Sequence, residues 1–155
     1  MIETQLAGKY AVITCGTQGL GEATARLFAE RGAAGLVICG RNTGRGEQVA
    51  RALNEAGSRT IYVRADLARL DDCRQVMAEA EAVFGRVDIL VNAAGITDRG
   101  TLLDTSPELF DRMMAVNLRA PFFLMQAAVK IMLREHIAGS IVNIMSMSAH
   151  GGQPF

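Results

Sequence analysis

The stretch TCGTQGLG, residues 14–21, joins two segments of different character. Before it lies an apolar run, KYAVIT at residues 9–14, which predicts a buried strand. After it, residues 19–31 place Leu20, Leu27 and Phe28 at helical spacing, and Gly32 stands where such a helix would end. Glycines between a strand and a helix let a ligand approach the backbone, and amides at a helix start carry positive partial charge. The stretch therefore predicts a phosphate-binding turn, and a flexible turn without a ligand is the alternative.

The alternation of strand and helix continues along the whole chain. Apolar runs predict further strands at residues 35–40 (GLVICG), 60–65 (TIYVRA), 87–92 (VDILVN) and 139–145 (GSIVNIM). Amphipathic spacing predicts helices at residues 45–56, at residues 70–84, from residue 106 to about residue 117, and at residues 120–136. Ser106 and Pro107 are typical of a helix start, as cap and first-turn residue.

This order of elements predicts the fold class. Strands that alternate with helices run parallel, joined by right-handed crossovers, with helices on both faces of the sheet. We therefore expect an α/β fold, a Rossmann-type doubly wound parallel sheet, as a single dinucleotide-binding domain over residues 1–155. Ligands of such sheets bind beyond the carboxyl ends of the strands, where residues 14–21 would lie.

Composition excludes several classes of function. The chain has 16 basic and 16 acidic residues, so it has no net positive charge to attract nucleic acid or an anionic membrane. We find no uninterrupted apolar run of membrane-spanning length and no signal peptide in the first nine residues. These features predict a cytoplasmic protein with neither nucleic acid nor membrane as a partner.

The cysteines and histidines indicate no metal site. Cys15, Cys39 and Cys73 are far apart in the sequence and form no Cys-x-x-Cys pair, and the chain has only two histidines, His136 and His150. We expect reduced, buried thiols rather than a disulfide framework.

The glycine-rich stretch resembles the fingerprint Thr-Gly-x-x-x-Gly-x-Gly of the short-chain dehydrogenase/reductase family. Thr14, Gly19 and Gly21 match it, and Cys15 stands where the family has its first glycine. A Cβ at this position is expected to press on the cofactor or to strain the turn. The resemblance implies that the turn binds the cofactor through Thr14, Gly16, Thr17, Gln18, Gly19, Leu20 and Gly21.

Two further cofactor motifs agree in order and spacing. Asp66-Leu67, after the third predicted strand, is similar to the family's aspartate that contacts the adenine ring, although an aspartate there is also a common helix cap. Asn92-Ala93-Ala94-Gly95, after the fourth predicted strand, resembles the family's Asn-Asn-Ala-Gly signature with alanine at its second position. The resemblance implies that this turn stabilises the sheet and passes along the cofactor.

Two catalytic residues are implied by the same resemblance. Asn117 is similar to the helix asparagine of the family's catalytic tetrad, and a helix-bending amide is its structural alternative. Ser146 takes the place of the catalytic serine at the end of the fifth predicted strand, with Ser148 as the rival. The implied reaction is hydride transfer between nicotinamide and an alcohol or carbonyl carbon of a small molecule, with Ser146 bonded to the substrate oxygen and a tyrosine as acid/base.

The family's Tyr-x-x-x-Lys motif is missing from the printed sequence. Its two tyrosines, Tyr10 and Tyr62, lie in early strands, and neither is followed by lysine four residues later. We therefore expect the amino-terminal portion of a longer enzyme, with a sheet truncated after the fifth strand and no activity of its own. A naturally short, non-catalytic NAD(P)-binding sensor or scaffold is the alternative, and coding sequence beyond Phe155 would distinguish the two.

The end of the second predicted strand bears on the choice of cofactor. NAD sites place an acidic residue about 20 residues past the glycine turn to bind the ribose hydroxyl. Here the strand ends in Gly40, followed by Arg41, whose guanidinium is suited to a 2′-phosphate. We expect NADP(H) as the preferred cofactor, with Arg45 adding positive field, and NAD(H) as the alternative. Gln18 is evidence against this choice, because many NADP-preferring relatives have a basic residue at its position.

The segment from Pro121 to Leu133 is apolar at nearly every position, with Gln126 and Lys130 among the few exceptions. A helix with so little polar surface must be covered on two sides, by the sheet and by a partner subunit. We expect the complete protein to be a homo-oligomer, a dimer or tetramer, as the family resemblance also implies. Deep burial within one chain is the alternative.

Overall fold

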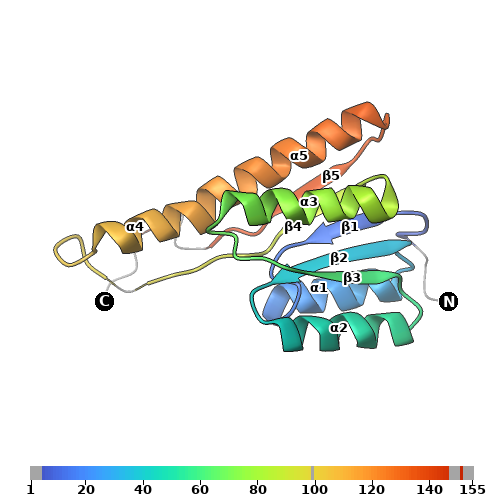
Figure 1. Cartoon of the computed structure of the whole chain (residues 1–155), viewed down its shortest axis with the longest axis horizontal. Coiled ribbons are helices and arrows are strands. Elements are labelled where there is room, and N and C mark those ends of the chain that lie inside the picture. The colour runs from blue at the N-terminus through green and yellow to red at the C-terminus, as the bar shows by residue number, and fades with distance from the viewer. Residues whose placement is uncertain (1–4, 99, 147–150, 152–155) are drawn as a thin grey trace.

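The computed structural model of the chain describes residues 5–98, 100–146 and 151. Five parallel strands form one sheet in the order β3-β2-β1-β4-β5 (Figure 1). The strands are β1 (Tyr10–Ile13), β2 (Gly35–Gly40), β3 (Thr60–Arg64), β4 (Ile89–Asn92) and β5 (Ser140–Asn143). This order confirms the predicted Rossmann-type doubly wound sheet.

Helices cover both faces of the sheet. Figure 1 shows α1 (Gly19–Glu30) and α2 (Thr43–Glu55) on one side, and α3 (Leu70–Phe84) and α5 (Ala120–Arg134) on the other. Two apolar clusters fill the layers between helices and sheet, one centred on Ile13, Leu36 and Ile38 and the other on Val12, Leu90 and Leu124. Successive residues of β1 belong to opposite clusters, because neighbouring side chains of a strand point to opposite faces.

The chain after β1 and the chain after β4 leave the sheet in different directions. β1 leads through α1 to β2 on one side, whereas β4 pairs with the other side of β1 and leads toward β5. This reversal of strand order opens a crevice at the carboxyl ends of β1 and β4, where doubly wound sheets bind their ligands.

Two helix boundaries differ from the sequence predictions. α2 begins at Thr43 rather than Arg45, because the Asn42 side chain caps it by accepting a hydrogen bond from the Arg45 amide at 2.9 Å. The helices predicted to be separate around residue 118 are one continuous helix: α4 (Pro107–Met114), a π-helical turn η1 (Ala115–Arg119), and α5. The wider π turn accommodates Pro121, whose ring would clash with the Asn117 carbonyl in a regular α-helix.

This continuous helix, Pro107–Arg134, is long and apolar enough to cross a membrane by length and composition alone. Arg119 and Lys130 interrupt the apolar sequence of this helix, so it contains no uninterrupted apolar run of membrane-spanning length. A core helix of a soluble protein passes the same test, and the side of α5 that carries Leu124, Ala128 and Ile131 is buried. The expectation that the protein has no membrane partner stays a prediction.

Asp88 anchors the amino-terminal end of the sheet, opposite the crevice. Its side chain is 1% exposed and accepts hydrogen bonds from the Arg86 guanidinium at 2.7 and 3.0 Å and from the Tyr10 amide at 3.0 Å. Lys9 lies 3.8 Å from the same carboxylate. The bonds join the start of β1 to the segment that enters β4, so this carboxylate fixes the two central strands relative to each other.

Replacing Asp88 with alanine should lower the free energy of unfolding by about 2–3 kcal/mol, because it leaves the Tyr10 amide and the Arg86 guanidinium without their partner. Urea unfolding followed by circular dichroism would measure the change. Asp71→Ala is the matched control, since Asp71 pairs with Arg74 on the surface and should contribute no more than about 0.5 kcal/mol. Equal losses for the two variants would contradict the anchoring role.

Candidate functional site

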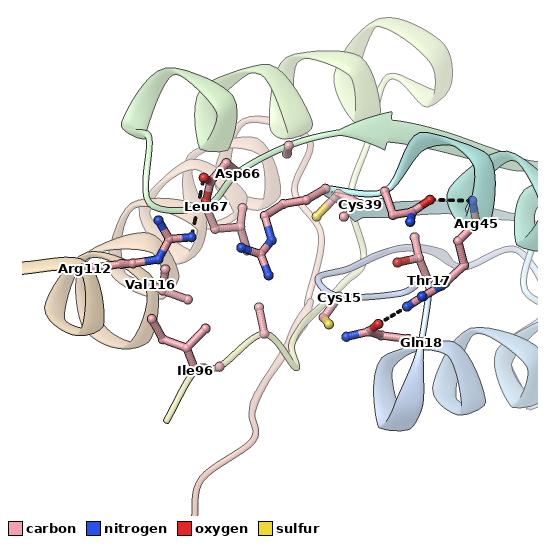
Figure 2. Close-up of a pocket in the computed structure, with 16 residues that line it drawn as sticks. Cys15, Thr17, Gln18, Cys39, Arg45, Asp66, Leu67, Ile96, Arg112 and Val116 are labelled. Atoms are coloured by element: carbon pink, nitrogen blue, oxygen red, sulfur yellow. Dashed lines mark hydrogen bonds and ion pairs between the residues drawn. The ribbon is translucent and has the colours of Figure 1, made fainter. Parts of the chain in front are cut away.

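A cavity of about 490 Å³ lies at the carboxyl ends of the central strands (Figure 2). Its volume is within the range of small-molecule and cofactor sites. The lining residues come from the end of β2, from the loops after β1, β2, β3 and β4, and from the helices α2, α4 and η1: Cys15, Thr17, Gln18, Cys39, Gly40, Arg41, Asn42, Arg45, Ala65, Asp66, Leu67, Ala94, Gly95, Ile96, Arg112 and Val116. Seven of the residues predicted to bind a cofactor are therefore brought together here: Thr17, Gln18, Arg41, Asp66, Leu67, Ala94 and Gly95.

The glycine-rich turn forms one wall of the cavity. The Gly16 amide donates to the Cys39 carbonyl at 3.2 Å, which holds the turn against the end of β2. Gly21 lies in the first turn of α1, where a Cβ would overlap the Cys15 carbonyl, so the helix start packs directly on the turn. Gly19 and Leu20 begin α1, and Leu20 is exposed. The turn thus presents the start of a helix to the cavity, as an anion site requires.

Thr14 supports this wall from behind and is itself buried. Its hydroxyl accepts hydrogen bonds from the amides of Ala93 and Ala94, at 2.9 and 3.0 Å. The Thr14 amide in turn donates to the Val91 carbonyl at 3.0 Å. Thr14 therefore joins the turn after β1 to the turn after β4, on the two sides of the crevice.

One end of the cavity is rich in cationic and amide groups. The Arg45 guanidinium reaches from α2 to the glycine-rich turn and donates a hydrogen bond to the Gln18 side-chain oxygen (Figure 2). Arg41 and Asn42, directly after β2, line the same cavity. Position 18 has no basic residue of its own. Gln18 instead positions the Arg45 guanidinium at the glycine-rich turn, and this group supplies positive charge there.

The other end holds an acidic group paired with an arginine. Asp66 follows β3, and its Oδ2 lies 3.9 Å from a guanidinium nitrogen of Arg112 on α4. The Asp66 Oδ1 accepts from the Ala68 amide at 3.1 Å, and the Asp66 amide donates to Asp72 at 2.8 Å. Arg112 could not be predicted as a site residue from the sequence, because no local pattern indicates that an exposed arginine in α4 meets a loop 46 residues earlier.

Asn117 lies in the π turn and holds the loop that follows β4. Its side chain donates to the Ile96 carbonyl at 2.8 Å and accepts from the Ile96 amide at 2.9 Å. π turns occur frequently at functional sites. Asn117 therefore fixes Ile96, which lines the cavity, rather than lining it itself.

The end of β5 carries the other predicted catalytic residue. Ser146 is exposed and follows the strand, whereas its rival Ser148 lies outside the described residues, as does His150. Nearby, the Asn92 amide nitrogen donates to Asn143 at 2.8 Å. Among the described residues, the buried Asn92 Oδ1 has no hydrogen-bond partner.

The three cysteines are free thiols in different surroundings. Burial raises the pKa of the Cys39 thiol to about 12 and that of Cys73 to about 11, so both are protonated at neutral pH. Cys15 is half-buried at the cavity wall, which corrects the expectation that all three thiols are buried.

A parallel doubly wound sheet with a glycine-rich turn at its switch point defines a dinucleotide-binding protein. Comparison with known families is more specific, because the short chain dehydrogenase model matches residues 9–155. The chain belongs to the short-chain dehydrogenase/reductase family.

Individual relatives agree with this assignment. The chain is 40% identical over 149 residues to the short chain dehydrogenase/reductase dpfgG of Gibberella zeae, which is 95% of this chain and 54% of the relative. It is similar to a gluconate 5-dehydrogenase of Burkholderia cenocepacia solved with NADP and tartrate, with a TM-score of 0.87, 35% identity and coverage of 99% and 59% of the two chains. A metagenomic short-chain oxidoreductase solved with NADP gives a TM-score of 0.86, 33% identity and coverage of 97% and 66%. The chain thus spans a little over half to two thirds of the length of these relatives.

Cys15 has a left-handed backbone, with φ of 54°, at the position where the family has its first glycine. This conformation costs a residue with a Cβ about 1–2 kcal/mol. Cys15→Gly should therefore raise the free energy of unfolding by about 0.5–1 kcal/mol, after the greater entropy of unfolded glycine is subtracted. Urea unfolding would measure it. Gly19→Ala, at φ of 55° in the same turn, should change stability in the opposite direction by about 1 kcal/mol. A loss of stability in Cys15→Gly would show that thiol contacts outweigh the strain.

Proposed function

We propose that the chain is the cofactor-binding part of an NADP(H)-dependent oxidoreductase, which transfers hydride between nicotinamide and an alcohol or carbonyl carbon of a small molecule. The observation that carries this proposal is the position of Arg41 in the cavity, directly after the strand end that would hold an acidic residue in an NAD site. The two ends of the cavity also differ in chemistry, as the two ends of adenosine 2′-phosphate do. One end is cationic and suits a phosphate, and the other has a carboxylate and apolar side chains and suits a base.

The cationic end is suited to the 2′-phosphate. Arg41, Asn42 and Arg45 can donate hydrogen bonds to phosphate oxygens, and bonds between charged groups are the stronger kind. No carboxylate lines this end among the described residues, so nothing there repels the phosphate. That two solved relatives hold NADP supports the same choice.

The residues near the ends of β4 and β5 would serve the reaction. When bound, the cofactor supplies or accepts the hydride. Ser146 would donate a hydrogen bond to the substrate oxygen and stabilise negative charge on it as the carbonyl is reduced. Asn117 would keep the loop at Ile96 in place through its two hydrogen bonds, so that the cavity wall does not move.

Arg41→Ala tests the cofactor assignment. Loss of a charged hydrogen bond, about 1.5–3 kcal/mol, should weaken NADP(H) binding tenfold or more and leave NAD(H) binding nearly unchanged. Dissociation constants of both cofactors for the wild type and the variant can be measured by isothermal titration calorimetry. Arg51→Ala, an exposed arginine of α2 outside the cavity, is the control and should change neither constant. Equal losses for the two cofactors in Arg41→Ala would reject the phosphate-binding role.

The outer side of the long helix supports the proposal that the complete protein is a homo-oligomer. Phe110, Met114, Leu118 and Phe122 recur every four residues and are 41–60% exposed, and Leu133 continues the exposed side at 71%. Such a row of exposed apolar side chains along α4, η1 and the start of α5 is typical of an interface. The sheet and α3 cover the opposite side of α5, where Leu124 and Ala128 are buried.

We therefore expect the complete protein to sediment as a dimer or tetramer at micromolar concentration, and Phe122→Glu to shift it toward the monomer because a buried charge opposes association. Analytical ultracentrifugation would measure both. Gln48→Glu, on the exposed surface of α2, adds the same charge elsewhere and should leave the mass unchanged. A monomeric wild type would contradict the proposal.

A further inference from the structure

We propose that Arg112 is a positioning residue for adenine recognition: it holds the Asp66 carboxylate so that this group accepts a hydrogen bond from the 6-amino group of the base. The inference rests on the proposed NADP(H) function and deepens it. Its basis is the juxtaposition of Asp66, from the loop after β3, with Arg112, from α4, at one end of the cavity (Figure 2).

One carboxylate oxygen of Asp66 accepts a hydrogen bond from the backbone of its own loop, and the other faces Arg112. Its Oδ1 accepts from the Ala68 amide at 3.1 Å, and its own amide donates to the Asp72 carboxylate at 2.8 Å, so the backbone of this loop is fixed. The Oδ2 lies 3.9 Å from the Arg112 guanidinium, close enough for attraction but too far for a hydrogen bond. Arg112 thus orients this oxygen without occupying its lone pairs.

The surroundings of this oxygen suit a flat base with an amino group. Leu67, Ile96 and Val116 line the same end of the cavity and offer apolar surface. The Arg112 guanidinium can only donate hydrogen bonds, and the 6-amino group of adenine is also a donor, so the two cannot bond to each other. Among the described side chains at this end, the Asp66 carboxylate is therefore the group able to accept from adenine.

A second arginine of the same helix contacts the same loop and provides the control. Arg119, two helical turns after Arg112, donates to the Ala68 carbonyl at 2.6 Å. Its bond goes to the backbone rather than to the carboxylate. If Arg112 merely tethers the loop to the helix, removing either arginine should have the same consequence.

The test compares NADP⁺ with its deaminated form, in which hypoxanthine replaces adenine and a keto oxygen replaces the amino group. The dissociation constants of both are measured for the wild type, Arg112→Met and Arg119→Met, with thermal unfolding of each protein to establish that it is folded. The wild type should prefer NADP⁺ by roughly tenfold or more, since the keto oxygen faces the carboxylate and cannot donate to it. Arg112→Met should reduce this preference to about threefold or less, whereas Arg119→Met should keep it.

Arg112→Lys is the conservative variant. Because the pair is too long for a hydrogen bond, a point charge should replace the guanidinium, and most of the preference for NADP⁺ should return. An unchanged or increased preference in Arg112→Met, or equal losses in the two methionine variants, would overturn the inference while NADP⁺ still binds. If neither cofactor form binds the wild type, the proposed function itself fails, and this inference with it.

Discussion

The hydroxyl of Thr14 joins the two halves of the sheet at the place where they separate. β1 ends there, and the turns after β1 and β4 diverge to open the crevice. The hydroxyl accepts from the amides of both Ala93 and Ala94, inside a buried setting in which an unpaired amide would be costly. This contact holds the glycine-rich turn against the start of the turn after β4, and Asn117 holds Ile96 farther along the same turn. Arg41, Asp66 and Arg112 are then carried to the same cavity by the strand ends and by α4.

Much of this arrangement could be predicted from the sequence, because it depends on local patterns. Apolar runs located the five strands, and the glycine-rich turn located the ligand end of the sheet. The cofactor choice also depends on adjacent residues, since Gly40 ends β2 and Arg41 follows it directly. The paired contacts could not be predicted. Arg112 reaches Asp66, and Asn117 reaches Ile96, only after the crossovers have brought distant segments together. The continuity of the long helix could not be predicted, because a proline at position 121 disfavours a regular α-helix through this region and the π turn that accommodates it has no simple sequence pattern.

Cys15 shows how the site combines stability with ligand binding. Its left-handed backbone lets the chain turn sharply from β1 into α1, and the carbonyl of the same residue lies against Gly21. A glycine would adopt this backbone without strain, and so the thiol side chain is tolerated at the cavity wall at some cost in stability. The burial of the Cys39 thiol, with its pKa near 12, makes that neighbour an inert part of the core.

We propose that the cavity binds the adenosine half of NADP(H), with the phosphate at one end and the base at the other. The decisive experiment is a crystal structure of the chain soaked with adenosine 2′,5′-bisphosphate, because this molecule has both groups but no nicotinamide. We expect the 2′-phosphate beside Arg41 and the adenine beside Leu67 and Val116, with its amino group toward Asp66. An empty cavity at saturating ligand concentration, or a ligand bound in the reverse orientation, would contradict the claim.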